Sequence, residues 1–129
     1  MESDCKYLFV YGSLLDGHNE FGVYLKNNSR AIAQSSFPGL LYDMGEYPGA
    51  IHKPQITGRV YGQIVQLNDA TILKALDEYE GFGDNEEQPN LFIRVMIPIA
   101  TKSGTIGCWV YLYNLPIAGY PQILSGRYK

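Results

Sequence analysis

The sequence predicts an α+β fold: a small closed or nearly closed mixed β-barrel of about six or seven strands, flanked by two or more short helices. The 129 residues include 11 tyrosines and 14 glycines, which favours a curved sheet over a helical bundle. Short apolar runs between turn signals outnumber segments with helical spacing, and parallel βαβ units would need more helix. We expect one domain over residues 1–129.

The N-terminal half is predicted to hold one short helix among strands. Lys6–Leu14 is an apolar and β-branched run, which is typical of a buried strand. Apolar residues recur at helical spacing over Asn19–Lys26, which predicts the helix. Phe37-Pro38-Gly39 indicates a turn. Further extended segments are expected over residues 31–35, 40–44 and 50–53.

A strand and the second helix are expected next. Arg59–Leu67 is a strand pattern, and Gly62 inside it indicates a bend or a close approach. Asn68 or Asp69 is a suitable N-cap, and Gly81 supplies the C-terminal stop. The helix between them has an apolar stripe, formed by Ile72, Leu73, Leu76 and Tyr79.

The C-terminal part is predicted to form a hairpin after an exposed acidic loop. The loop covers Gly83–Asn90, and its polar composition is typical of a flexible segment. Phe92–Thr101 is a long strand, in which Pro98 indicates a sheet edge or a bulge. Lys102–Gly104 is the hairpin turn, and Thr105–Tyr113 is the returning strand. The residues after 113 are expected to be irregular.

Bulk properties exclude several classes of protein. Apolar residues make up 46% and charged residues 18% of the chain, as in ordinary globular proteins. A net charge of −3 with scattered basic residues gives no surface for nucleic acid. No stretch approaches a membrane span, and the first residues lack a signal-peptide pattern. We expect a cytoplasmic protein, either a monomer or a homodimer.

The cysteine and histidine residues suggest neither a disulfide framework nor a metal site. Cys5 and Cys108 are too few for a disulfide scaffold, and we interpret them as buried inert thiols rather than redox or nucleophilic groups. His18 and His52 are isolated, so no metal is expected. Gly81-Phe82-Gly83 follows a helix and is not a dinucleotide fingerprint. We expect no cofactor.

The end of the first strand is the first candidate site. Gly12 would let the backbone approach a ligand closely. The amides of Gly12, Ser13 and Leu14 can form a nest for a carboxylate or a developing oxyanion. The alternative is a plain strand end with a tight turn.

Five motifs in order resemble those of the γ-glutamyl cyclotransferase-like family. The chain has Tyr11-Gly12-Ser13-Leu14 near its start and Leu76-Asp77-Glu78-Tyr79-Glu80-Gly81-Phe82 about 65 residues later. Leu41–Ala50, Val60–Ile64 and the closing Ser125-Gly126 also match. The resemblance is to the branch of γ-glutamylamine cyclotransferases and avirulence-induced plant proteins. It implies a β-barrel flanked by helices.

The resemblance implies a cofactor-independent reaction on a small γ-glutamyl amine or peptide. The substrate's own α-amine attacks its γ-carbonyl and releases 5-oxoproline and a free amine. Two alternatives remain open. The chain could be a catalytically silent module that binds a small molecule with the same fold, or an interaction protein that uses a tyrosine-rich surface.

The resemblance also implies roles for individual residues. Glu80 corresponds to the family's general acid/base. The helix pattern agrees, because Glu78 lies opposite the apolar stripe and should face water, whereas Glu80 lies at its edge, where burial should raise its pKa. The loop formed by Tyr11, Gly12, Ser13 and Leu14 would bind the glutamyl group. Further tyrosines could line the pocket, namely Tyr47, Tyr111 and Tyr113.

Two segments depart from the family pattern. Many members have Tyr-x-Arg where this chain has Phe92-Ile93-Arg94, and many end in Ser-Gly-Asp-Trp where this chain has Ser125-Gly126-Arg127-Tyr128. Neither change touches Glu80 or the Tyr11–Leu14 loop, so both put the identity of the substrate in question more than the reaction type.

Overall fold

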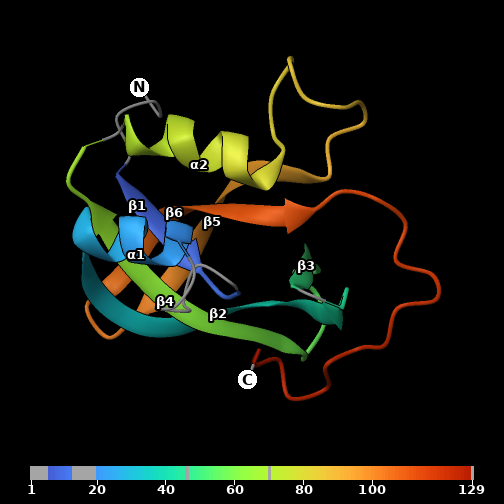
Figure 1. The fold of residues 1–129 in the computed structure, drawn as a ribbon. Coiled ribbons are helices and arrows are strands. Elements are labelled where there is room, and N and C mark those ends of the chain that lie inside the picture. The colour runs from blue at the N-terminus through green and yellow to red at the C-terminus, as the bar shows by residue number, and fades with distance from the viewer. Residues whose placement is uncertain (1–5, 13–19, 46, 70, 129) are drawn as a thin grey trace.

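Six strands of the described chain form a single strongly curled sheet, with two short helices beside it (Figure 1). The computed structural model describes residues 6–12, 20–45, 47–69 and 71–128. The elements in order are β1 (Tyr7–Val10), α1 (Glu20–Asn27), β2 (Ser29–Asp43), β3 (Pro48–His52), β4 (Arg59–Leu67), α2 (Ile72–Glu80), β5 (Phe92–Thr101) and β6 (Gly104–Tyr113).

The sheet is mixed and nearly closes on itself. Its strand order is β3-β2-β4-β1-β6-β5. The β1–β6 pair is parallel and the other neighbouring pairs are antiparallel. The Ser35 hydroxyl donates to the Ala100 carbonyl at 2.5 Å, which links β2 to the edge strand β5. The result is a half-barrel with two helices, so the predicted α+β fold is confirmed.

The turn expected at Phe37-Pro38-Gly39 is wrong. The backbone continues through these residues as one 15-residue strand, β2. Up to Pro38 this strand pairs with β4, and from Gly39 onward it pairs with β3. Pro38, which lacks an amide hydrogen, therefore stands where β2 changes partner rather than where the chain reverses.

Other predicted boundaries differ by only a few residues. The strands over Arg59–Leu67 and Phe92–Thr101 have the expected bounds, and Pro98 lies on the edge strand β5. The second helix starts later than predicted, at Ile72. The Asp69 carboxylate instead accepts a hydrogen bond from the Thr71 amide just before the helix, a local turn that delays its first residue.

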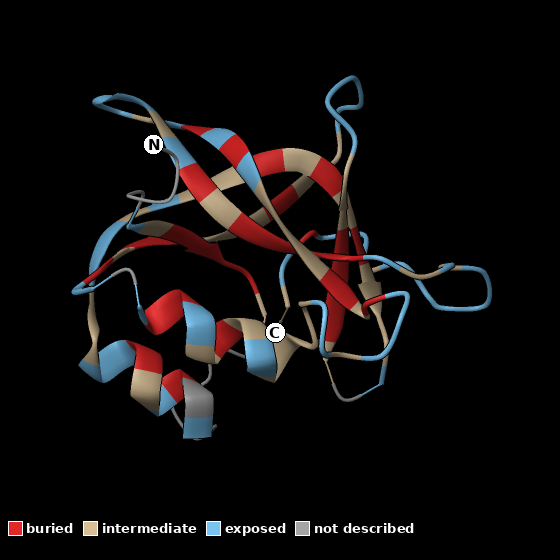
Figure 2. Ribbon diagram, turned by 90° about the horizontal axis from the view of Figure 1, so that it is seen from above, coloured by how far each residue is buried: buried red, intermediate tan, exposed pale blue. Residues whose placement is uncertain are grey.

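Buried side chains form two layers, one on each face of the curled sheet. Because successive residues of a strand point to opposite faces, Leu8 and Val10 of β1 join one layer and Phe9 joins the other. The first layer also contains Leu25 of α1 and Leu76 of α2, so both helices cover that face. The second layer fills the concave side. Figure 2 shows buried residues along the strands of the sheet and in both helices.

The C-terminal segment runs back along β2 and β4. The Asp43 amide donates to the Pro121 carbonyl, and the Tyr61 amide donates to the Gly126 carbonyl, both at 2.9 Å. Gly126 has φ +73°, and a Cβ there would overlap the Arg59 carbonyl oxygen. Only glycine fits this position. The Arg127 guanidinium lies 4.1 Å from the centre of the Tyr61 ring.

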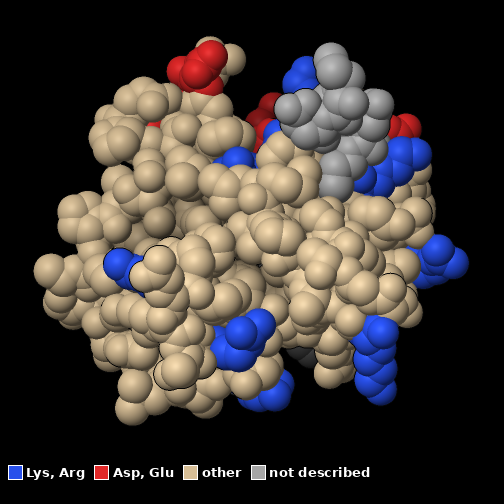
Figure 3. Space-filling view, turned by 180° about the vertical axis from the view of Figure 1, so that it is seen from behind, with Lys and Arg blue, Asp and Glu red and all other residues tan. Residues whose placement is uncertain are grey.

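Charged side chains on the surface are dispersed. On the face shown in Figure 3, lysine and arginine residues are spread out rather than gathered in one patch. Within the residues that the structure describes, no helix is long and apolar enough to span a bilayer.

Candidate active site

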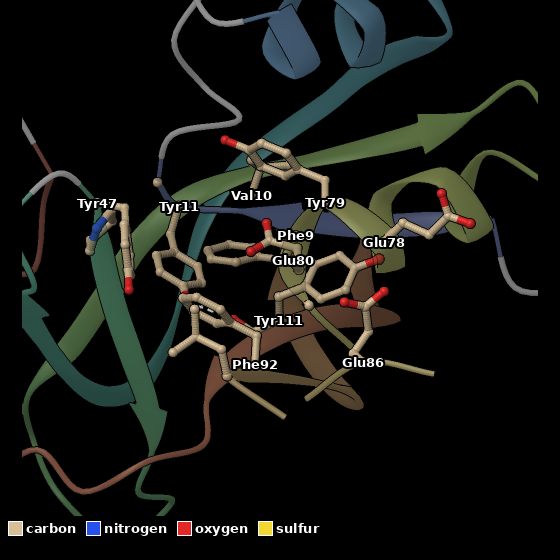
Figure 4. A pocket seen from close by; sticks show the side chains of 14 residues that line it. Phe9, Val10, Tyr11, Tyr47, Glu78, Tyr79, Glu80, Glu86, Phe92 and Tyr111 are labelled. Carbon is tan, nitrogen blue, oxygen red and sulfur yellow. Dashed lines mark hydrogen bonds between the residues drawn. The ribbon is translucent and has the colours of Figure 1, made fainter. Parts of the chain in front are cut away.

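A cavity of about 420 Å³ lies between the end of β1 and the last turn of α2 (Figure 4). Strands, the turn before β3, the end of α2 and the loop after it all contribute to its walls. Its lining residues are Phe9, Val10, Tyr11, Gly12, Tyr47, Pro48, Glu78, Tyr79, Glu80, Gly81, Glu86, Leu91, Phe92 and Tyr111.

Glu80 is the last residue of α2 and reaches this cavity because of how the helix is anchored and ended. The buried residues Leu73 and Leu76 fix the apolar face of α2 on the sheet. Gly81 ends the helix in a left-handed conformation, with φ 74°, and its amide closes the last turn. The Glu80 carboxylate lies among the rings of the cavity (Figure 4).

The Glu80 carboxyl group binds a proton unusually tightly. Burial is the main cause and the negative charge of Asp77 the second, and together they raise its pKa to about 7. The direction is the one that the sequence predicts. Such a carboxyl can both accept and donate a proton at neutral pH.

Glu78 is exposed, as predicted, but it also lines the cavity. Because Glu78 is exposed, it marks the side on which the cavity opens to solvent, and in Figure 4 its carboxylate points away from the central group of side chains. Glu86 from the following loop lines the same cavity. The opening therefore has two carboxylates in addition to Glu80, and no lysine or arginine is among the described lining residues.

Tyr11 contributes its ring to the cavity, while its hydroxyl group holds strands together. The hydroxyl donates to the Tyr111 carbonyl at 2.6 Å and accepts from the Ala50 amide at 3.2 Å. Burial, followed by the charge of Glu80, raises the pKa of Tyr11. Tyr11 thus remains a neutral phenol that connects β1 with β6 and β3.

The hydroxyl group of Tyr111 is also engaged. It donates to Asp77 Oδ1 at 2.7 Å. Burial and this hydrogen bond raise the pKa of Tyr111. Asp77 in turn forms an ion pair with Arg94, at 2.7 Å from Oδ1 to Nε. The sequence analysis did not single out this pair, although a charged residue within the apolar strand Phe92–Thr101 was a usable signal.

Gly12 lies against the cavity wall beside Pro48. A Cβ on Gly12 would stand 2.6 Å from Pro48 Cγ, so a larger residue cannot fit without displacing this wall. Both residues line the cavity. Ser13 and Leu14, the other two residues of the predicted nest, lie outside the described residues.

The remaining predicted tyrosines differ in position. Tyr47 lines the cavity and its ring centre is 5.8 Å from that of Phe92, which also lines it. Tyr113 is not among the lining residues; it packs on the far side of Phe92, with ring centres 5.6 Å apart. Burial raises the pKa of Tyr113, with Tyr120 as the next cause.

The loop between α2 and β5 is ordered by its own side chains, which its polar composition did not indicate. Asn90 is buried and accepts a hydrogen bond from the Gly83 amide, while its side-chain nitrogen donates to the Gly83 and Glu87 carbonyls. The side-chain nitrogen of Gln88 donates to the Gly83 and Glu86 carbonyls. These bonds fix Glu86 at the cavity. Asp84 and Glu87 are exposed and do not line it.

Among the described residues, no three His, Cys, Asp or Glu side chains come together in a way that could hold a metal ion. Cys108 is buried on β6, as predicted, and Cys5 lies outside the described residues.

The family model for "Gamma-glutamyl cyclotransferase, AIG2-like" proteins matches residues 8–129. The chain belongs to this family. A γ-L-glutamyl-butirosin B γ-glutamyl cyclotransferase of Niallia circulans is 34% identical over 108 residues, which cover 83% of this chain. The match spans only 66% of that relative's own length. The γ-glutamylcyclotransferase family protein YtfP of Escherichia coli is 29% identical over 92% of both chains.

Solved structures of family members have the same fold. The solution structure of YtfP from Escherichia coli matches with a TM-score of 0.67 over 95% of both chains. The crystal structure of an AIG2-like protein from Mus musculus matches with a TM-score of 0.68 at 17% identity, over 96% of this chain and 88% of the other. The latter likeness supports the fold alone.

The two departures from the family pattern have different positions. Phe92 lines the cavity, so the exchange of a family tyrosine for phenylalanine removes a hydroxyl group there. Arg127 contacts Tyr61, and neither residue is among those that line the cavity. Of these two residues, only Phe92 lines the cavity.

Proposed function

We propose that this protein is a γ-glutamyl cyclotransferase that converts a small γ-glutamyl amine to 5-oxoproline and a free amine. The observation that carries this proposal is the Glu80 carboxyl group, whose pKa is raised to about 7 at the wall of a cavity with Gly12 in its lining. Membership of the γ-glutamyl cyclotransferase family supports the same reaction class.

In this proposal, Glu80 is the general acid/base. Its carboxylate takes a proton from the α-ammonium group of the substrate, and the resulting amine attacks the γ-carbonyl carbon. The protonated Glu80 then gives this proton to the leaving nitrogen as its bond to the carbonyl carbon breaks. The Glu80 carboxylate that is restored takes the second proton, which the ring nitrogen must lose, and passes it to the released amine. A carboxyl group with a pKa near the working pH is suited to both transfers, because neither accepting nor donating the proton is strongly unfavourable.

The loop that follows β1 is proposed to bind the reacting carbonyl oxygen. The amides of Gly12, Ser13 and Leu14 are the candidate donors. The same amides are the candidates for binding the α-carboxylate of the glutamyl group. One such donor contributes about 3 kcal/mol in the transition state. The rings of Tyr11, Tyr47 and Tyr111 would fold the glutamyl chain so that amine and carbonyl meet.

The acidic opening supports a leaving group that bears an amine. Glu78 and Glu86 would attract a cationic group and repel a second carboxylate such as those of glutathione. The Niallia circulans relative is named for a γ-glutamyl substrate, γ-L-glutamyl-butirosin B. We therefore expect γ-glutamyl amines to outperform glutathione.

The test is release of 5-oxoproline from a panel of γ-glutamyl amines and peptides by the wild-type protein and Glu80→Gln. Glutamine keeps the size of the side chain but cannot accept the proton, so turnover should fall by about 10² to 10⁴. Glu20→Gln, the same change on exposed α1 away from the cavity, is the matched control. Wild-type turnover in Glu80→Gln contradicts the proposal.

The alternative of a catalytically silent binding module has one observation in its favour, the apolar ring of Phe92 at a position where many relatives have tyrosine. It predicts 5-oxoproline binding by calorimetry with no release from any member of the panel. Phe92→Tyr would then restore turnover if the missing hydroxyl group is the cause.

A further inference from the structure

Asp77 and Arg94 form a bidentate ion pair beside the cavity that the proposed reaction does not use. Arg94 Nε donates to Asp77 Oδ1 at 2.7 Å, and Arg94 Nη2 donates to Oδ2 at 3.1 Å. The side chains are only 18% and 19% exposed. With the Tyr111 hydroxyl as a third donor, the carboxylate is held by three hydrogen bonds.

The position of Arg94 follows from the strand that carries it. Arg94 is paired with Tyr111 across the β5–β6 register, so both point to the helix-covered face. Its guanidinium carbon lies 4.4 Å from the centre of the Trp109 ring and 5.8 Å from that of Phe82. A flat cation between aromatic rings with two parallel donors is an arrangement that arginine makes and lysine does not.

Asp77 lies one turn before Glu80 on α2, and residues three apart on a helix are neighbours. The ion pair therefore connects the last turn of this helix to β5, and through Tyr111 to β6. Rotation or fraying of this turn would break all three hydrogen bonds of Asp77. The turn that carries Glu80 is thus fixed by polar contacts at its end and by Leu76 at its middle.

We propose that Asp77 and Arg94 are positioning residues for Glu80: their ion pair holds the last turn of α2 against β5 and places two opposite charges near the end of this helix, from which they control proton uptake by Glu80 in opposite directions. The catalytic meaning of this control rests on the proposed function.

Two charges of opposite sign explain the balance. The charge of Asp77 raises the pKa of Glu80, since a second carboxylate nearby disfavours ionisation. The Arg94 guanidinium, 2.7 Å from that carboxylate, offsets part of its charge, so loss of Arg94 should raise the pKa of Glu80 further. Burial remains the larger cause of the raised pKa, and the pair adds two opposite charges whose effects nearly cancel.

Few other charges face Glu80. The other titratable groups of the described cavity come from β1, the turn before β3, α2 itself, the loop after α2, and β6; they are Tyr11, Tyr47, Glu78, Tyr79, Glu86 and Tyr111. Tyr11 and Tyr111 stay neutral, because burial raises the pKa of each. The two glutamates are at the opening, where water screens their charge.

The direct test is a carboxyl carbon NMR titration of Glu80 without substrate, with Glu80→Gln to assign its signal. Asp77→Asn should lower the pKa of Glu80 and Arg94→Gln should raise it, each by about one pH unit. The double variant, which removes both charges, should titrate near the wild-type value. Arg94→Lys keeps the charge and should shift the midpoint less than Arg94→Gln.

Arg59→Gln is the matched control, because Arg59 binds Ser36 on β2 and does not line the cavity. Its titration should equal that of the wild type. If Arg94→Gln fails to fold, Asp77→Asn and the double variant decide the question. Equal midpoints in wild type, Asp77→Asn and the double variant overturn the proposal, as do shifts of the same sign in both single variants.

Kinetics separate this inference from the proposed function. The midpoint of the acidic limb in the profile of kcat/KM against pH should shift to lower pH with Asp77→Asn and to higher pH with Arg94→Gln. The reason is that Glu80 must be ionised to accept the first proton. Opposite NMR shifts without release of 5-oxoproline by any variant support the ion pair and contradict the cyclotransferase activity. Release of 5-oxoproline with NMR midpoints that do not shift supports the cyclotransferase activity and contradicts the role of the ion pair.

Discussion

The two walls of the cavity are built from different chemistry. The wall from β1, β3 and β6 is aromatic and uncharged, and the Tyr11 and Tyr111 hydroxyl groups already bind other parts of the protein. The wall from α2 and the loop after it carries the carboxylates, Glu78, Glu80 and Glu86. The first wall is suited to determine shape, and the second is suited to move protons and select charge.

This division follows from the elements themselves. Strand side chains have neighbours on both sides, and the hydroxyl groups of the two buried tyrosines already have partners, Tyr11 within the sheet and Tyr111 on α2. A helix end and a loop meet solvent, and a carboxylate there can stay partly hydrated. A residue that must change its protonation state is better placed on the second kind of element.

The largest expected effect is a loss of affinity for 5-oxoproline when the wall formed by the strands is disrupted. Gly12→Val places a branched side chain against Pro48, where even a Cβ would be 2.6 Å from Cγ. Affinity for 5-oxoproline in calorimetry should fall by at least about 30-fold, equivalent to about 2 kcal/mol. Gly107→Val is the control, because Gly107 is exposed on β6 and its nearest neighbour is the flexible Met96. Unchanged affinity in Gly12→Val would remove this wall from the site.

The next effect concerns the helix wall and is a change in stability. The pKa of Glu80 is raised from 4.5 to about 7 in the folded state. The contribution of Glu80 to folding is therefore fully present below pH 4.5 and is lost as the pH rises through 7. Glu80→Gln should match the wild type in urea unfolding at pH 4.

At pH 8 the same variant should be more stable than the wild type by roughly 2 kcal/mol, after allowance for solvent screening at the cavity. The reason is that the wild type must keep an ionised carboxylate in a poorly hydrated position. A stability difference that does not change between the two pH values contradicts the raised pKa.

The smallest expected effect is a change in substrate selectivity when the carboxylates at the cavity opening are removed. Glu78→Gln with Glu86→Gln removes two carboxylates while Glu80 remains. The ratio of kcat/KM for γ-glutamyl-lysine to that for glutathione should fall about three-fold to tenfold and depend less on salt. Asp84→Asn with Glu87→Gln is the control, since both residues are exposed on the same loop but do not line the cavity. If Glu78→Gln with Glu86→Gln gives the same ratio as the control variant, these two carboxylates have no part in selectivity.

The sequence predicted the elements whose signals are local. β4 and β5 are rich in apolar and β-branched residues, and Gly81 ends α2 as expected, because strand propensity and a left-handed cap depend on neighbouring residues. The partner change at Pro38 could not be predicted, since it depends on pairing with β3 and with β4, and β4 begins only 21 residues after Pro38. A proline and a glycine in sequence favour a turn unless the sheet supplies partners.

The site was predictable to the same extent. Glu80 followed from a motif and from its place beside the apolar stripe, both local properties. The ion pair with Arg94 joins a helix to a strand 17 residues away, and the Tyr111 hydroxyl reaches Asp77 from 34 residues away. The spacing along the chain contains no information on such contacts, so Asp77 was identified only as part of the motif.

The hydrogen bonds around Asn90 make the loop after α2 a self-contained unit. The side chains of Asn90 and Gln88 bond to Gly83 and to other carbonyls of the loop, and the Asn114 side chain joins the base of the loop to the end of β6. A replacement loop would thus need to match only its two ends and not the barrel. Exchange of this unit, by evolution or by design, would change one border of the cavity while Glu80 and the sheet stay as they are.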